Sequence, residues 1–156
     1  MKRSTIRAIS GSTAFAALML IWAGPAHAAP SYVLKDLQTH LCLTASNIDR
    51  GFATRDCKEG DLYQRFALES LNDGTLAIMS DGTGKCLDGS QDGNVYQTTC
   101  NAQNPYMHWY VTERGKDSYS YRSKGTGLCL DSRGDGSAYG RECNSGDYQV
   151  WSRIAP

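Results

Sequence analysis

The apolar residues of this chain follow a period of two in short stretches, which is the pattern of β-strands. Three such stretches contain the pairs Tyr32 and Leu34, Leu76 and Ile78, and Tyr119 and Tyr121. Turn-forming clusters such as Asn72-Asp73-Gly74, Asp92-Gly93 and Asp135-Gly136 separate the apolar stretches. Their spacing of roughly 8 to 12 residues is typical of all-β folds, and no segment shows an apolar period of 3.6. The sequence therefore predicts an all-β protein of short strands.

The strand pattern recurs three times along the chain. Aligned on a cysteine, the three copies read Thr39-His40-Leu41-Cys42-Leu43, Thr83-Gly84-Lys85-Cys86-Leu87 and Thr126-Gly127-Leu128-Cys129-Leu130, a period of 43 or 44 residues. Each copy ends in an aromatic block: Tyr63-Gln64-Arg65-Phe66, Tyr106-Met107-His108-Trp109 or Tyr148-Gln149-Val150-Trp151. We place repeats 1, 2 and 3 at about residues 31–70, 71–114 and 115–156.

Each repeat has room for about four strands, and a unit of that size cannot bury its apolar face alone. The copies must therefore close on one another. A propeller needs roughly four or more blades, so three units favour a threefold barrel with a hairpin cap, the β-trefoil. Phe66, Trp109 and Trp151 are expected in its core, whereas His40 and His108 are expected to be ordinary surface or strand residues.

The first 28 residues have the composition of a secretory signal peptide. Lys2, Arg3 and Arg7 precede an apolar run over residues 14–23, and Ala26-His27-Ala28 is an Ala-x-Ala cleavage pattern. The run is about ten residues long, whereas a membrane span needs roughly 20. We expect cleavage before Ala29 and a secreted, extracellular domain over residues 29–156.

The net charge of the chain argues against two classes of partner. The first 28 residues hold three of the 16 basic residues and none of the 16 acidic ones, so the remainder has a net charge of −3. That balance gives no electrostatic attraction to nucleic acid and no polybasic surface for an anionic membrane. We expect neither nucleic acid nor membrane insertion.

The cysteines are even in number, six in all. In an oxidising compartment, an even number of cysteines is expected to form disulfides. Among the fifteen possible pairings, the spacing favours one bond within each repeat: Cys42 with Cys57, Cys86 with Cys100, and Cys129 with Cys143, separated by 15, 14 and 14 positions.

Several of these features together resemble the ricin-type β-trefoil lectin repeat. They are Cys-Leu-Asp at residues 86–88 and 129–131, a second cysteine 14 residues on, and Gln149-x-Trp151 six residues beyond it. The likeness covers residues 31–154 and is closest to the bacterial secreted members. It implies carbohydrate binding, with one shallow pocket in each repeat that keeps the motif.

The resemblance also implies which residues would bind a sugar. A carboxylate accepts hydrogen bonds from two vicinal hydroxyls, and an aromatic ring packs on the C–H face of a hexose. The family's Asp and its polar residue after the second cysteine match Asp88 with Asn101, and Asp131 with Asn144. The usual ring, two residues before the second cysteine, is missing, but Tyr96 and Tyr139 lie two residues earlier, on the same side of a strand.

The expected carbohydrate-binding residues are therefore Asp88, Tyr96 and Asn101 in repeat 2 and Asp131, Tyr139 and Asn144 in repeat 3. Repeat 1 has Thr44 and Lys58 in place of the acid and amide, and is expected to be inactive. Both acids are expected at the surface. The tyrosines before the Gln-x-Trp position either add a second ring to each pocket or close it.

Other chemistry has less support in the sequence. Residues 131–142 fit some positions of a calcium-binding loop, but Arg133 stands where a ligand is needed and the flanking helices are missing, so no metal or other cofactor is expected. No nucleophile with an adjacent base indicates an enzyme. The alternative to a lectin is a trefoil that binds a secreted protein, such as an inhibitor of an extracellular hydrolase.

Overall fold

The computed structural model describes residues 29–48 and 51–156, and the expected signal peptide lies outside the described residues. The strands of repeat 1 are β1 (Ser31–Asp36), β2 (Cys42–Ala45), β3 (Phe52–Arg55) and β4 (Arg65–Ser70). Those of repeat 2 are β5 (Leu76–Ser80), β6 (Cys86–Gly89), β7 (Val95–Thr98) and β8 (Trp109–Gly115). Those of repeat 3 are β9 (Ser118–Ser123), β10 (Cys129–Ser132), β11 (Ala138–Arg141) and β12 (Trp151–Ile154). A single-turn 3-10 helix precedes the last strand of each repeat: η1 (Leu62–Gln64), η2 (Pro105–Met107) and η3 (Asp147–Gln149).

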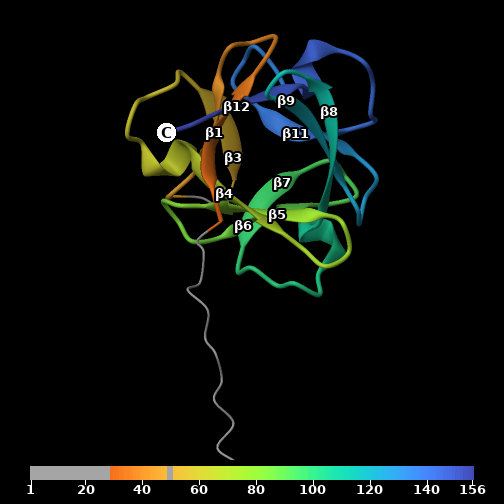
Figure 1. Cartoon of the computed structure of the whole chain (residues 1–156). Coiled ribbons are helices and arrows are strands. Elements are labelled where there is room, and N and C mark those ends of the chain that lie inside the picture. The colour runs from red at the N-terminus through yellow and green to blue at the C-terminus, as the bar shows by residue number, and fades with distance from the viewer. Residues whose placement is uncertain (1–28, 49–50) are drawn as a thin grey trace, which may run out of the picture.

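Six of these strands close into a barrel. β1 pairs with β12 and β4, β5 pairs with β4 and β8, and β9 pairs with β8 and β12, all antiparallel. The ring of pairings returns to its start, so it has no free edge that could pair with another chain. Figure 1 shows the barrel strands of the three repeats surrounding a common centre.

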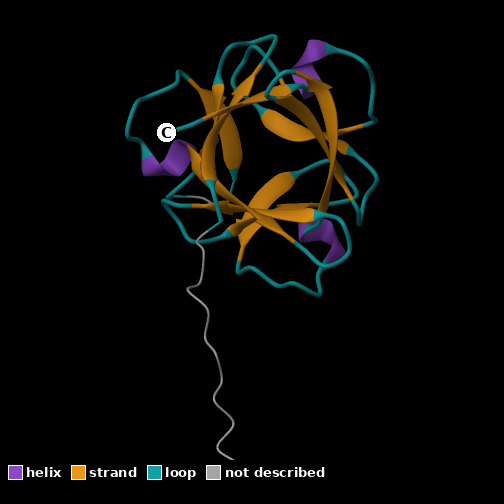
Figure 2. Cartoon of the chain, in the orientation of Figure 1, coloured by secondary structure: helices purple, strands orange, loops and turns teal. Residues whose placement is uncertain are grey.

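The other six strands form three hairpins, β2–β3, β6–β7 and β10–β11, which meet as a cap. Backbone hydrogen bonds join the hairpins, from Thr54 N to Gly136 O (2.8 Å) and from Gly140 N to Gly93 O (2.6 Å). A Cβ on Gly93 would lie 2.6 Å from the Gly140 oxygen, so only glycine allows this approach. The three 3-10 helices lie at three separate corners of the molecule (Figure 2). The prediction of a β-trefoil is confirmed.

The predicted aromatic core is also confirmed. Phe66, Trp109 and Trp151 are at most 1% exposed. Each tryptophan Nε1 donates to a backbone oxygen of the neighbouring hairpin, Leu87 O or Leu130 O, at 3.1 Å. A buried indole thus keeps its hydrogen bond while its rings fill the barrel.

The disulfides have the predicted connectivity: Cys42–Cys57, Cys86–Cys100 and Cys129–Cys143. Each bond joins the first strand of a cap hairpin to the segment that follows the second strand. Each disulfide therefore ties down the cap hairpin of its own repeat, in the same way in all three repeats.

A tight turn after the first strand of each repeat shows the threefold relation in detail. The backbone nitrogens of His40, Gly84 and Gly127 donate to the oxygens of the residues four positions earlier. All three residues have positive φ, with values of 61°, 65° and 76°. The expectation of an ordinary strand or surface residue therefore misses the conformation of His40, which is exposed but occupies a position where the other repeats use glycine.

Replacing His40 by glycine is expected to stabilise the fold by up to about 1 kcal/mol, because a side chain in the left-handed region costs about 1–2 kcal/mol and glycine's added freedom in the unfolded chain offsets part of that gain. Urea denaturation measures the change. Gly127→Ala is the matched control, since a Cβ there would have no neighbour within 4 Å, and it should destabilise by about 1 kcal/mol. Equal effects of the same sign would contradict the argument.

His108 is buried, contrary to the expectation of a surface residue, and its ring joins a network with exposed partners. His108 is 7% exposed, with Nδ1 2.8 Å from Asp73 Oδ2 and Nε2 3.0 Å from the Ala102 oxygen. Lys124 Nζ also lies 2.8 Å from Asp73 Oδ2. The pKa of Asp73 lies far below its usual value. The largest cause is the hydrogen bond from Lys124, and the second is the hydrogen bond from Thr75. The network links repeats 2 and 3.

A lowered carboxyl pKa stabilises the folded state at pH values above the unfolded pKa of about 4, and this contribution is lost as the pH falls below it. Asp73→Asn should therefore lower the melting temperature at pH 6, and the difference from the parent should narrow between pH 4 and pH 2. Thermal melts across that range measure it. In a Lys124→Met background the pH 6 difference should shrink, and an unchanged difference there would show that Lys124 is not the partner.

Candidate functional site

The cap hairpins bring each candidate acid beside its candidate ring. Asp88 is the register partner of Tyr96 across β6–β7, and Asp131 is the partner of Tyr139 across β10–β11. In repeat 1 the equivalent pair is Thr44 and Ala53. Repeat 1 thus lacks both the carboxylate and the ring at this place.

The expectation that both acids lie at the surface is wrong. Asp88 is 2% and Asp131 3% exposed, because the 3-10 segment of the same repeat packs against the strand that carries each acid. A buried carboxylate needs hydrogen-bond donors, and the two repeats supply them differently.

In repeat 3 the donor is the glutamine of the Gln-x-Trp sequence. Gln149 Nε2 donates to Asp131 Oδ2 at 2.8 Å and to the Glu142 oxygen at 3.0 Å, while Gln149 Oε1 accepts from Asn144 N at 2.9 Å. Gln149 is itself fully buried. In repeat 1 the same glutamine, Gln64, donates to the Thr44 hydroxyl at 3.0 Å.

Repeat 2 has methionine at this position, and a thioether cannot donate a hydrogen bond. Met107 Sδ accepts from Asn101 N, as the glutamine oxygen does elsewhere. The missing donor is replaced by Asn104, whose Nδ2 lies 2.9 Å from Asp88 Oδ2. Asp88 Oδ1 is buried without a hydrogen-bond partner in the described chain, and burial raises the pKa of this carboxyl.

Asn104 is a site residue that sequence reasoning missed. It also accepts from Tyr106 N through its side-chain oxygen, as the N-cap of η2. The loss of glutamine at position 107 was visible in the sequence and signalled that the acid needed a new donor. Which residue supplies that donor depends on the three-dimensional course of residues 101–107.

The candidate amides differ between the two repeats. Asn144 lines a pocket of about 280 Å³ together with Asp131, Tyr139 and Tyr148, so the trio expected in repeat 3 is brought together. Asn101 lines a different pocket beside Cys86 and Cys100. Its side-chain oxygen accepts from Gln103 N at 3.0 Å, and no hydrogen bond joins it to Asp88.

The tyrosines before the glutamine position fall into two kinds. A Cβ on Gly82 would lie 2.7 Å from Tyr63 Cδ1, and one on Gly125 would lie 2.6 Å from Tyr106 Cδ1, so both tyrosines pack closely against a glycine of the next repeat. In repeat 1 the position of Gly82 and Gly125 is occupied by Gln38, which has a side chain, so Tyr148 has no corresponding glycine. Tyr148 is 43% exposed and lines the repeat 3 pocket.

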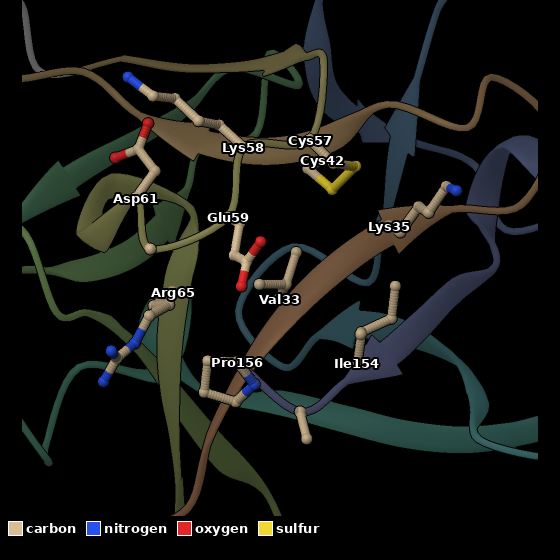
Figure 3. Close-up of a pocket in the computed structure, with 12 residues that line it drawn as sticks. Val33, Lys35, Cys42, Cys57, Lys58, Glu59, Asp61, Arg65, Ile154 and Pro156 are labelled. Atoms are coloured by element: carbon tan, nitrogen blue, oxygen red, sulfur yellow. A yellow bond between two sulfur atoms is a disulfide. The ribbon is translucent and has the colours of Figure 1, made fainter.

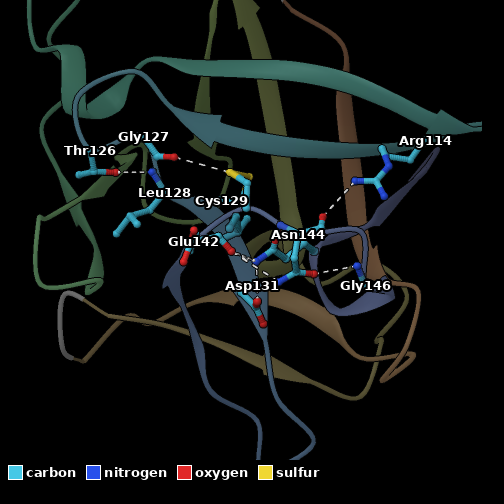
Figure 4. The surroundings of a disulfide bond; sticks show 12 residues. Arg114, Thr126, Gly127, Leu128, Cys129, Asp131, Glu142, Asn144 and Gly146 are labelled. Atoms are coloured by element: carbon cyan, nitrogen blue, oxygen red, sulfur yellow. Dashed lines mark hydrogen bonds between the residues drawn. A yellow bond between two sulfur atoms is a disulfide. The ribbon is translucent and has the colours of Figure 1, made fainter.

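A second kind of pocket lies beside the disulfides. In repeat 1 it has a volume of about 230 Å³ and includes the Cys42–Cys57 bond, Val33, Glu59 and Pro156 (Figure 3). In repeat 3, the Arg114 guanidinium donates to the Asn144 oxygen at 3.4 Å (Figure 4) and to the Ser145 oxygen at 3.3 Å. These pockets contain neither of the candidate acids.

Two further observations concern the described residues alone. Within residues 29–48 and 51–156 no group of three or more His, Cys, Asp or Glu side chains is placed to hold a metal ion. No helix in the same ranges is long and apolar enough to cross a membrane.

The fold and the hairpin geometry agree with comparisons against known proteins. The sequence profile of the ricin-type beta-trefoil lectin domain matches residues 30–151. The chain therefore belongs to the family of ricin-type β-trefoil lectin domains. A search of curated protein sequences gives no match.

Solved structures with the same fold include a designed protein, a saccharide-bound protein and part of an enzyme. ThreeFoil, a designed threefold-symmetric protein, is 23% identical with a TM-score of 0.71, over 80% of this chain and 97% of that one. SeviL, solved bound to asialo-GM1 saccharide, is 15% identical with a TM-score of 0.69, over 81% and 97%. An exo-beta-1,3-galactanase from Clostridium thermocellum is 20% identical with a TM-score of 0.71, over 81% of this chain but 30% of the enzyme. At these identities the likeness shows the fold alone.

Proposed function

We propose that the protein binds carbohydrate, with its principal site in the repeat 3 pocket formed by Asp131, Tyr139, Asn144 and Tyr148. The observation that carries the proposal is the geometry of the acid. Asp131 Oδ2 is held by Gln149, which fixes the carboxylate in place and leaves Oδ1 to accept from sugar hydroxyls. The exposed ring of Tyr148 supplies a face for the C–H side of the sugar.

Repeat 2 is proposed as a second, weaker site. Asp88 and Tyr96 stand in the same register as their counterparts in repeat 3, and Asn104 takes the place of the glutamine. Asp88 Oδ1 is enclosed, so a sugar must first displace neighbouring groups, which reduces affinity. Repeat 1, with Thr44 and Ala53, is proposed to be inactive.

A shallow site of this kind typically contributes about −4 to −6 kcal/mol, which corresponds to millimolar to tens of micromolar affinity. Two sites that bind one polymer at once can raise its retention by about 10²-fold or more. We therefore propose a polysaccharide or a multivalent glycan as the natural ligand. The proposed place of action is extracellular, supported by the three disulfides and by the leader-like residues 1–28.

A glycan array probed with the folded, disulfide-intact protein tests the proposal. Binding to a defined set of glycans is the expected result. If no glycan is bound and the protein instead inhibits a secreted hydrolase, the carbohydrate-binding proposal is overturned and the trefoil acts as a protein-binding module.

A further inference from the structure

The repeat 3 pocket contains two arginines that the carbohydrate-binding proposal does not use. Arg133 and Arg141 both line it, beside Asp131 and Tyr139. Asp131 is the sole acidic side chain among its lining residues, so the wall of the pocket has an excess of one positive charge.

Neither guanidinium is within salt-bridge distance of an acidic side chain in the described residues. No ion pair within 4.0 Å involves Arg133 or Arg141 in the described part of the chain. Asp135, two positions after Arg133, accepts from the nitrogen and hydroxyl of Ser137 at 2.9 and 2.7 Å. These two bonds are the largest causes of its lowered pKa, and the charge of Arg133 is a lesser one. Both arginines are exposed and are therefore accessible to a ligand.

Part of the Arg133 guanidinium is already in contact with Tyr139. Its Nε donates to the Tyr139 hydroxyl at 3.2 Å, and its guanidinium carbon lies 5.0 Å from the centre of the Tyr139 ring. A ring that is covered in this way is not free for stacking on a sugar until Arg133 moves. The two Nη groups have no hydrogen bond in the described chain, and a planar guanidinium with free N–H donors matches a carboxylate or sulfate group.

The other repeats provide an internal comparison. Aligned through the hairpin registers, the counterparts of Arg133 and Arg141 are Ser90 and Thr98 in repeat 2, and Ser46 and Arg55 in repeat 1. Repeat 3 alone combines the acid, the ring and two arginines. The arginines are therefore not part of the shared framework of the hairpin.

We infer that the repeat 3 pocket selects glycans carrying a negatively charged group, a carboxylate or a sulfate ester, which Arg133 and Arg141 bind while Asp131 accepts from the hydroxyls of the same or the next sugar. This inference rests on the proposed function. It adds a class of ligand, acidic glycans, and two specificity-determining residues.

Titration calorimetry with three trisaccharides tests it: a neutral galactose trisaccharide, the galacturonate trisaccharide and a sulfated galactose trisaccharide. At 50 mM NaCl at least one acidic ligand should bind about tenfold or more tightly than the neutral one. The advantage should shrink as NaCl rises to 500 mM, because salt screens exposed charges. The two acidic ligands distinguish a carboxylate-binding from a sulfate-binding pocket.

Variants locate the effect. Arg133→Gln and Arg141→Gln should each remove most of the acidic advantage, and Arg141→Gln, which leaves Tyr139 as it is, should keep affinity for the neutral ligand within about twofold. Arg55→Gln, the matched change in repeat 1, should alter neither. Melting temperatures near that of the parent show that each variant is folded.

The outcomes separate this inference from the function on which it rests. If neutral glycans bind as tightly as acidic ones, or if the arginine variants keep the preference, the inference is overturned while carbohydrate binding stands. If neither the trisaccharides nor an array of neutral and acidic glycans gives binding, carbohydrate binding itself fails.

Discussion

Replacing Asp131 by asparagine is expected to weaken glycan binding by about 10- to 100-fold. A hydrogen bond to a charged group contributes about 1.5–3 kcal/mol, which is about a factor of 10 to 100 in affinity. Asparagine keeps the shape of the side chain and can still accept from Gln149 Nε2 through its oxygen. Its amide group then replaces the acceptor that would face the sugar.

The same substitution at Asp88 should weaken binding much less, because Asp88 Oδ1 is enclosed in the folded state. Thr44→Ala in repeat 1 is the matched control and should leave binding unchanged. Retention on a polysaccharide resin, with calorimetry on oligosaccharides, measures all three variants, and the double variant at both acids should show no retention. If Asp131→Asn binds like the parent, or if Asp88→Asn has the larger effect, repeat 3 is not the principal site.

Removal of the disulfide in repeat 3, by replacing Cys129 and Cys143 with alanine, is expected to lower the free energy of unfolding by about 3 kcal/mol. A bond that closes a loop of about 15 residues restricts the unfolded chain by roughly this amount in the chain-entropy model. That is a large part of the 5–15 kcal/mol typical of a small domain. The sequence separation across this bond is 14.

Urea denaturation of the parent and the double variant measures the loss. The corresponding variant at Cys86 and Cys100, with the same separation of 14, should lose a similar amount, since both bonds hold equivalent hairpins. Removal of all three bonds is expected to leave little folded protein. Peptide mapping without reduction is an independent check, and a bond between cysteines of different repeats would contradict the repeat alignment.

Two residues show why the candidate site was only partly predictable. Tyr139 lies opposite Asp131, as expected from the period of two in a strand, which puts residues two positions apart on the same face. Asn104 was missed because its contact with Asp88 spans 16 positions and depends on the path of a loop. No local pattern encodes that path.

The burial of the two acids has the same explanation. In the sequence Asp88 and Asp131 stand beside turn residues, and a polar residue there is usually exposed. In the fold, the strands that carry them lie in the cap, beneath the 3-10 segment of the same repeat. That neighbouring segment, and not the strand itself, removes the carboxylates from water.

The sequence by itself determined the repeat, the strand content, the disulfide pairing and the aromatic core, because each of these follows from periodicity and spacing along the chain. The tertiary structure alone decided which donor holds each acid, that Tyr148 is exposed while Tyr63 and Tyr106 pack on glycines, and that Arg133 and Arg141 share a pocket with Asp131. These features arise where segments of different strands and repeats meet, and contact between distant segments depends on the closure of the barrel and its cap.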